Sequence, residues 1–144
     1  MLFRTLATLA LTLSLAMAAP TGAVDRGTGD TLDDAQELVD NQNWTAALAV
    51  LKRVVAGSPD DPDALNLLAY VLRHSGDYRN AEGFYLKALG IDPQHLGANE
   101  YLGELYALSG ALSKARERLA MVEAICGTDC EEYRELAAAI EAAE

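Results

Sequence analysis

Basic residues are scarce in this chain. Lysine and arginine together number 11, against 22 aspartates and glutamates, so the formal net charge at pH 7 is −11. Binding to a nucleic-acid backbone needs clustered cations that displace counterions, and docking on an anionic membrane surface needs them as well. The charge balance therefore argues against nucleic acid and against an anionic membrane as partners.

Residues that build catalytic and metal sites are also few. The 144 residues include two histidines, two cysteines and one tryptophan, so one copy of the chain has too few imidazoles for a multi-histidine site. No serine sits in a nucleophile-elbow pattern, and there is no glycine-rich phosphate loop. The sequence predicts neither an enzyme nor a cofactor or metal site.

Apolar residues make up 51% of the chain, enough to bury a core, and an apolar stretch stands near the N-terminus. Arg4 precedes the stretch, which spans 6–15 and is followed by Ala16-Met17-Ala18. This layout is typical of a secretory signal peptide, and the stretch is shorter than the roughly 20 residues that span a bilayer. We expect residues 1–18 to be a signal peptide and residues 19–29, rich in Gly, Thr and Pro, to be a flexible leader.

The signal sequence predicts export. Cleavage is expected after Ala18, a second small-residue site would cut after Ala23, and a retained N-terminal anchor is the alternative to cleavage. We therefore expect an exported protein, periplasmic if its source is a diderm bacterium, with no membrane insertion once the signal is removed. Its cysteines would then meet an oxidising compartment.

The rest of the chain repeats with a period of 34 residues. Shifting the sequence by this period aligns small residues with small ones and large residues with large ones. Two small columns and one large column are Ala35, Ala69 and Gly103; Ala47, Ala81 and Ala115; and Leu51, Tyr85 and Leu119. Three units result, over 28–61, 62–95 and 96–128.

Each unit has the pattern of a helical hairpin. In both halves of a unit the apolar residues recur at three- and four-residue steps, which is the period of a helix. Gly76 and Gly110 stand between the halves and permit a tight turn. Pro59 and Pro93 stand at the ends of units, because proline cannot continue a helix. The pattern predicts two antiparallel helices per unit.

These motifs resemble the tetratricopeptide repeat (TPR). The first unit departs from the TPR pattern, since Gln42 replaces the turn glycine and Asp34 replaces a leucine. The resemblance covers roughly 100 residues, 28–128, and implies an all-α, right-handed α-solenoid of three helix-turn-helix units. The second unit matches best, with Leu68-Ala69, Leu72, Gly76-Asp77-Tyr78, Ala81, Tyr85, Ala88-Leu89 and Asp92-Pro93.

A solenoid must cover its last apolar face, and the C-terminal residues have a suitable pattern. Leu136 and Ile140 lie on one helical stripe with Tyr133, and acidic residues cover the rest. The segment Thr128-Asp129-Cys130-Glu131 matches the capping box that starts a helix. We therefore predict a C-terminal capping helix over 129–144, and seven helices in all.

The resemblance also implies a binding surface, because TPR arrays typically bind extended peptides or partner helices on the concave face formed by the first helix of each repeat. Asn66 offers a donor and an acceptor to a peptide backbone, Arg73 a bidentate partner for a carboxylate, and Tyr70 a rigid contact area. The alternative is an ordinary solvated face with local Arg–Glu pairs. Projecting the repeat gives six candidate peptide-binding residues: Asn66, Tyr70, Arg73, His74, Glu100 and Glu104.

Two further patterns allow more than one interpretation. Glu100 and Glu104 stand one helical turn apart, as acid–base or metal carboxylates do, but nothing apolar flanks both, which favours a solvated helix face.

Cys126 and Cys130 have C-x3-C spacing, unlike C-x2-C redox or haem motifs. Export favours a disulfide that links the third repeat to the capping helix, whereas thiol redox or Cu(I) capture and inert free thiols are the alternatives.

The sequence thus predicts an exported TPR adaptor that binds a peptide segment or helix of another envelope protein in its concave groove. The alternative function is a thiol redox or soft-metal-handling protein that acts through Cys126 and Cys130, with the repeats as a docking platform. A self-assembling solenoid is a third possibility, and the pattern does not give the oligomeric state. The acidity of the chain predicts a groove ligand that is basic or neutral towards the third repeat.

Overall fold

The computed structural model describes residues 30–144, so the predicted signal peptide and leader lie outside the described residues. The described part contains seven helices and no strand, which confirms the predicted fold class. The helices are α1 (Leu32–Asp40), α2 (Trp44–Gly57), α3 (Pro62–His74), α4 (Tyr78–Ile91), α5 (Leu96–Leu108), α6 (Leu112–Cys126) and α7 (Glu131–Ala142).

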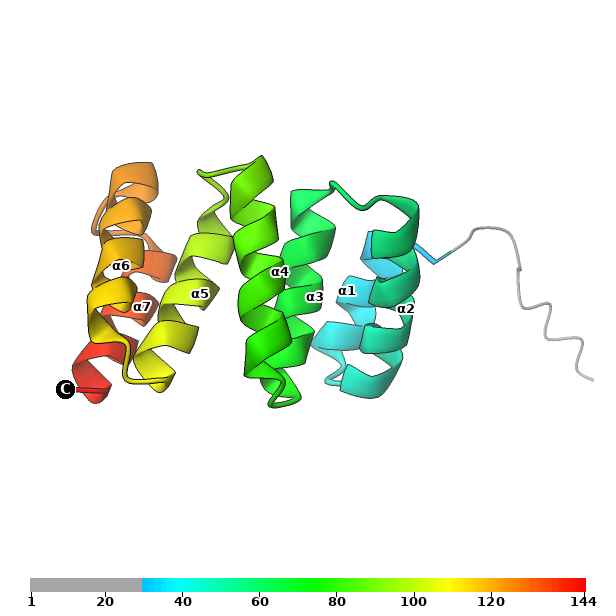
Figure 1. Cartoon of the computed structure of the whole chain (residues 1–144), viewed down its shortest axis with the longest axis horizontal. Coiled ribbons are helices and arrows are strands. Elements are labelled where there is room, and N and C mark those ends of the chain that lie inside the picture. Colours follow the sequence, from blue (N-terminus) through cyan, green and yellow to red (C-terminus); the bar gives the residue numbers. More distant parts are fainter. Residues whose placement is uncertain (1–29) are drawn as a thin grey trace, which may run out of the picture.

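The three hairpins follow one another in chain order along the long axis of the molecule, and α7 lies at the C-terminal end (Figure 1). Each helix packs against the next, and the first helices of successive hairpins, α1, α3 and α5, also contact one another. These first helices form one layer and α2, α4 and α6 form the other. Within residues 30–144, no helix is both long and apolar enough to cross a membrane.

The turns inside the three hairpins share one backbone geometry. Gly76 and Gly110 have φ values of 81° and 74°, in the left-handed region that glycine enters without steric cost, and Gln42 adopts φ 56° at the same repeat position. The residue after each turn starts the second helix. Asn43 and Asp77 accept a hydrogen bond from the helix with their side chains, whereas Ala111 has no such group.

The columns read from the sequence form the core. Ala35, Ala69, Ala47, Ala81 and Ala115 are all fully buried, so the helices of each hairpin approach closely across alanine. Large apolar side chains fill the space beside them, and the most voluminous fully buried ones are Tyr85, Leu51, Leu65, Leu102 and Leu136.

A buried amide in the third hairpin has no counterpart in the apolar pattern. The Asn99 side chain is fully buried; its Nδ2 donates to the carbonyl oxygens of Pro93 (3.1 Å) and His95 (3.0 Å). Arg118 on α6 donates to its Oδ1 at 3.0 Å. Every polar atom of this buried group is therefore paired, and it links α5, α6 and the turn before α5.

The C-terminal helix α7 packs closely against the third hairpin. α7 contacts both α5 and α6, and its contact with α5 is more extensive than that of α3 with α5. The cause is Gly103, over which the fully buried Leu136 lies: an added Cβ at Gly103 would be 2.6 Å from Leu136 Cδ2. Figure 1 shows α7 beside α6 and α5 at the C-terminal end of the array.

The predicted start of the last helix is wrong. α7 begins at Glu131, its N-cap is Cys130, and no side chain of a capping box bonds to it. Cys130 is held in an extended conformation with φ −75° and ψ 158°. The chain is still turning from α6 to α7 at Thr128, which therefore lies too early to cap the helix.

Candidate peptide-binding groove

A cavity of about 600 Å³ opens between α1, α3, the start of α2 and Tyr101 of α5. Its position agrees with the repeat architecture, because the first helices of successive hairpins together form the concave surface of such an array. We call this cavity the aromatic pocket. Its walls include Gln36, Asp40, Trp44, Tyr70, His74 and Tyr101.

Four rings form a continuous wall of the aromatic pocket. The rings of Trp44 and His74 are nearly parallel, with centroids 4.5 Å apart. Tyr70 continues the wall, 4.4 Å from His74 and 4.9 Å from Tyr101. Aromatic wall and polar rim together give a surface on which a ligand side chain gains both contact area and hydrogen bonds.

Two of these rings were missed by sequence reasoning. Neither Trp44 nor Tyr101 is among the six residues that the repeat projection selects. The available signal was position: Trp44 follows the turn at Gln42 directly and begins α2, so its ring reaches back to the inner helix α3. Of the six predicted residues, Asn66, Tyr70 and His74 do line the pocket.

The pocket histidine is neutral at pH 7. Partial burial lowers the pKa of His74 below its ordinary value of 6.5, and the positive charge of Arg73 lowers it further. His74 therefore contributes a ring face and no formal charge to the pocket wall.

Arg73 does not offer the free guanidinium that was predicted for a ligand carboxylate. Its Nη1 donates to Glu104 Oε2 at 2.8 Å, and only 17% of its side chain is exposed. Its Cζ lies 5.5 Å from the ring centroid of Tyr70 and 5.6 Å from that of Tyr101. The guanidinium of Arg73 is therefore already paired within the chain, with one carboxylate and two ring faces.

Glu100 is not the solvated residue that its spacing suggested. It is 3% exposed, because α7 lies over this part of α5. Carboxylate oxygens of Glu100, Glu104 and Glu135 lie within 4.8 Å of one another. Burial first, and then the charges of Glu104, Glu135 and Glu132, raise the pKa of Glu100 to about 8. Glu100 therefore holds a proton at neutral pH.

Glu104 has a milder environment than Glu100. Burial raises its pKa above the ordinary value, while the Arg73 guanidinium acts in the opposite direction. Glu100 therefore forms part of the contact between α5 and α7, whereas Glu104 and Arg73 line a second cavity of about 360 Å³ between α5 and the end of α7.

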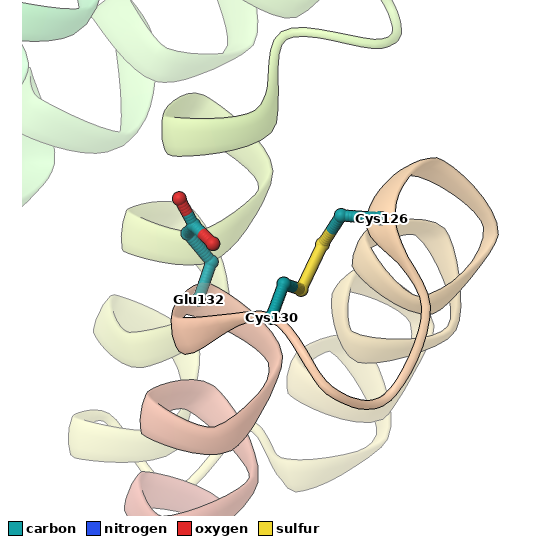
Figure 2. Close-up of side chains that lie close together, drawn as sticks. All are labelled: Cys126, Cys130 and Glu132. Carbon is teal, nitrogen blue, oxygen red and sulfur yellow. A yellow bond between two sulfur atoms is a disulfide. The ribbon is translucent and has the colours of Figure 1, made fainter.

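The two cysteines lie at the junction of α6 and α7. Figure 2 shows Cys126 at the end of α6 bonded to Cys130 before α7, with Glu132 beside them. The sulfur atoms and the Glu132 carboxylate are near enough to one another to suit a metal ion. A soft metal would need both sulfurs as thiolates, so only the reduced pair could hold one.

Stacked helical hairpins with an open groove on their inner face define a helical-repeat scaffold for protein interaction. Two family models described as tetratricopeptide repeat match residues 32–95 and 72–140, which together are more than half of the chain. The chain belongs to the TPR family.

Similar proteins agree with this assignment. The DnaJ protein P58IPK homolog B of Oryza sativa subsp. japonica is 31% identical over 81 residues, 56% of this chain and 17% of that protein. The chain therefore spans only a small part of this curated relative. Among solved structures, the translocator chaperone SycD of Yersinia enterocolitica has a TM-score of 0.69 at 17% identity, over 81% of this chain and 85% of that one.

A second solved structure has the same fold. MamA from Desulfovibrio magneticus RS-1 has a TM-score of 0.66 at 25% identity, over 78% of this chain and 63% of that one. These neighbours, together with the family models, support a scaffold for protein interaction built from TPR units.

Proposed function

We propose that this protein is an exported, non-catalytic TPR adaptor that holds a segment of another envelope protein in its inner groove, in the aromatic pocket. The observation that carries the proposal is the open, ring-lined cavity of about 600 Å³ on the helices that face inward. A cavity of this size suits one or two side chains of a peptide. Wall residues from α1, α2, α3 and α5 would contact the segment along its length.

Two observations support the adaptor. SycD has been solved in complex with a peptide of the translocator YopD, so a chain of this fold and comparable length does bind a peptide. The signal-like N-terminus of this chain, with Arg4, the apolar stretch and Ala16-Met17-Ala18, supports export. In a diderm bacterium the site of action would be the periplasm.

Capture of the partner from an envelope extract tests the groove. The variant Tyr70→Ala/His74→Ala removes two rings of the pocket wall and is expected to reduce recovery of the partner about tenfold, since a few central aromatic residues carry most of an interface's energy. Circular dichroism would verify that the variant is folded. The matched control is Tyr78→Ala, an exposed tyrosine of α4 outside the pocket.

Crosslinking gives an independent readout. A photoreactive phenylalanine in place of Gln36, at the pocket, is expected to crosslink to the same partner, and one in place of Tyr78 is not. Equal recovery with the wild type and the Tyr70/His74 variant, together with equal crosslinking from both positions, would show that the groove is not the binding site.

The cysteine pair fits the adaptor as a structural link. In an oxidising compartment, a Cys126–Cys130 disulfide would hold the start of α7 to the end of α6. Closing so short a loop is expected to contribute about 2 kcal/mol through the entropy of the unfolded chain. Cys126→Ser/Cys130→Ser is therefore expected to lower the free energy of unfolding by about that amount, measured by urea denaturation, and to leave partner capture unchanged.

Two results would contradict this role. One is a pair of alkylatable thiols in freshly exported protein. The other is a well-folded double-serine variant that has lost its cellular function, which would favour thiol chemistry instead.

A further inference from the structure

We propose that the aromatic pocket selects a basic side chain, lysine or arginine, of the segment that the adaptor holds. This inference rests on the proposed function, and it specifies the partner's chemistry at one place in the groove. The observations that carry it are the charges around the cavity, the ring wall and one carboxylate at its rim.

The pocket contains negative charge and no available positive charge. Asp40 is the one residue among its wall residues with a formal charge at pH 7, since His74 is neutral there. Arg73, which precedes His74 in the chain, already pairs with Glu104. A ligand carboxylate would meet Asp40 without a counterion, whereas an ammonium or guanidinium group would find its counterion there.

The Asp40 carboxylate is accessible and held in place. The residue is exposed at the end of α1, and Gln36 Nε2 donates to its Oδ1 at 2.8 Å. Among the hydrogen bonds of the described part, none goes to Oδ2. A lysine or arginine that enters the pocket can therefore bond to Oδ2 while Oδ1 remains bonded to Gln36.

Helix α1 extends this negative field beyond the pocket. It carries Asp33, Asp34, Glu37 and Asp40 and no basic residue. Acidic groups on one side of an open groove raise the local concentration of cationic ligands and speed their encounter. The helix that borders the groove thus favours a basic segment over an acidic or neutral one.

The ring wall suits the same ligand. Lysine and arginine carry an aliphatic stem that packs on aromatic faces and a cation that the ring quadrupole attracts. The chain contains its own example, because the Arg73 guanidinium lies over Tyr70 and Tyr101. The stacked rings of Trp44 and His74 offer a ligand cation a further aromatic surface in the same cavity as Asp40.

Fluorescence of Trp44, the single tryptophan of the chain, reports directly on the pocket. The probes are four acetylated, amidated pentapeptides Gly-Gly-X-Gly-Gly, in which X is arginine, lysine, leucine or glutamate. We expect saturable changes in emission with arginine and lysine, at affinities about tenfold higher than with leucine, and none with glutamate.

The variant Asp40→Asn is expected to lower the affinity for the arginine and lysine peptides about tenfold and to reduce its dependence on salt. The control is Asp60→Asn, which removes the same charge from an exposed position between α2 and α3, outside the aromatic pocket and outside α1. It is expected to change affinity less than about twofold, because an exposed charge away from the ligand is screened.

Each outcome decides the inference. Preference for arginine and lysine that depends on Asp40 supports it. Equal or tighter binding of the leucine or glutamate peptide overturns it but leaves the groove as a peptide site. No response of Trp44 to any probe also overturns it. The adaptor itself fails only if, in addition, the Tyr70/His74 variant captures the partner as well as the wild type does.

Discussion

Raising the pH from 7 to 9 is expected to lower the free energy of unfolding by about 1 kcal/mol through Glu100. The folded protein holds a proton on this buried carboxyl, whose pKa of about 8 lies well above the ordinary 4.5. The unfolded chain releases that proton above pH 4.5. The stabilising contribution is therefore complete below pH 4.5 and is lost as the pH rises through about 8.

Glutamine at position 100 mimics the protonated acid. Glu100→Gln keeps the size and a donor at the contact with Glu135 and removes the charge that α7 would bury at high pH. We expect this variant to be more stable than the wild type at pH 9 by roughly 2–4 kcal/mol, less than the full pKa difference implies, because α7 can loosen and admit water. The difference should shrink as the pH falls.

Urea denaturation at pH 7, 8 and 9 measures this effect, and EDTA in each buffer removes divalent cations that would otherwise balance the three carboxylates. The range from pH 7 to 9 lies above the titration of His74. The lowered pKa of His74 makes stability rise with pH only below about 6.5. The matched control is Glu123→Gln, an exposed glutamate of α6. Parallel pH profiles for the wild type and Glu100→Gln would contradict the assignment of the buried proton.

The regular part of this fold follows from its period, because residues 34 apart occupy equivalent environments. The alanine columns at Ala35 and Ala69 are buried for one reason, close approach within a hairpin, and the turn positions share positive φ whether glycine or Gln42 fills them. A pattern repeated three times therefore predicts element type, turn position and core.

The site depends on departures from the period, which the pattern cannot predict. Glu100 shares a column with Leu32 and Asn66, which are partly exposed, yet it is buried. The reason is α7, a helix outside the repeat, whose position depends on side-chain packing at Gly103. Repeat projection assigned Glu100 to an open face because it treats every unit as having the same neighbour.

Repeat projection predicts only part of the aromatic pocket, for the same reason. Tyr70 and His74 lie on a first helix, and the projection assigns them to the inner face. Trp44 belongs to a second helix, which projection assigns to the outer layer, and its contact with His74 arises from the turn before it. Contacts between the two helix layers depend on the length and direction of individual side chains. A column of residue types does not contain those directions.

Gly103→Ala is expected to destabilise the protein by about 1–3 kcal/mol, although alanine fills the equivalent positions 35 and 69. The new Cβ would lie 2.6 and 2.7 Å from the two Cδ atoms of Leu136 and 3.0 Å from Arg118 Cβ. Leu136 is fully buried, so it has little room to move away. Thermal or urea unfolding measures the loss.

The control is a second glycine in a helix interior. Gly83 on α4 has nothing within 4 Å of an added Cβ, so Gly83→Ala is expected to stabilise the protein by about 0.5–1 kcal/mol through helix propensity alone. Stability changes of opposite sign for Gly103→Ala and Gly83→Ala would separate the steric clash with α7 from the effect of helix propensity. A stabilising Gly103→Ala would mean that α7 does not pack on α5 as described.

A double-mutant cycle locates the clash on Leu136. Leu136→Ala alone leaves a cavity and is expected to cost about 2–5 kcal/mol. Adding Gly103→Ala to it returns a methyl group to that cavity, so the double variant should be more stable than the sum of the two losses by at least about 1 kcal/mol. Such coupling requires direct contact between the two positions. Additive losses would instead mean that Leu136 does not contact position 103, which would contradict the packing of α7 over α5 and Glu100.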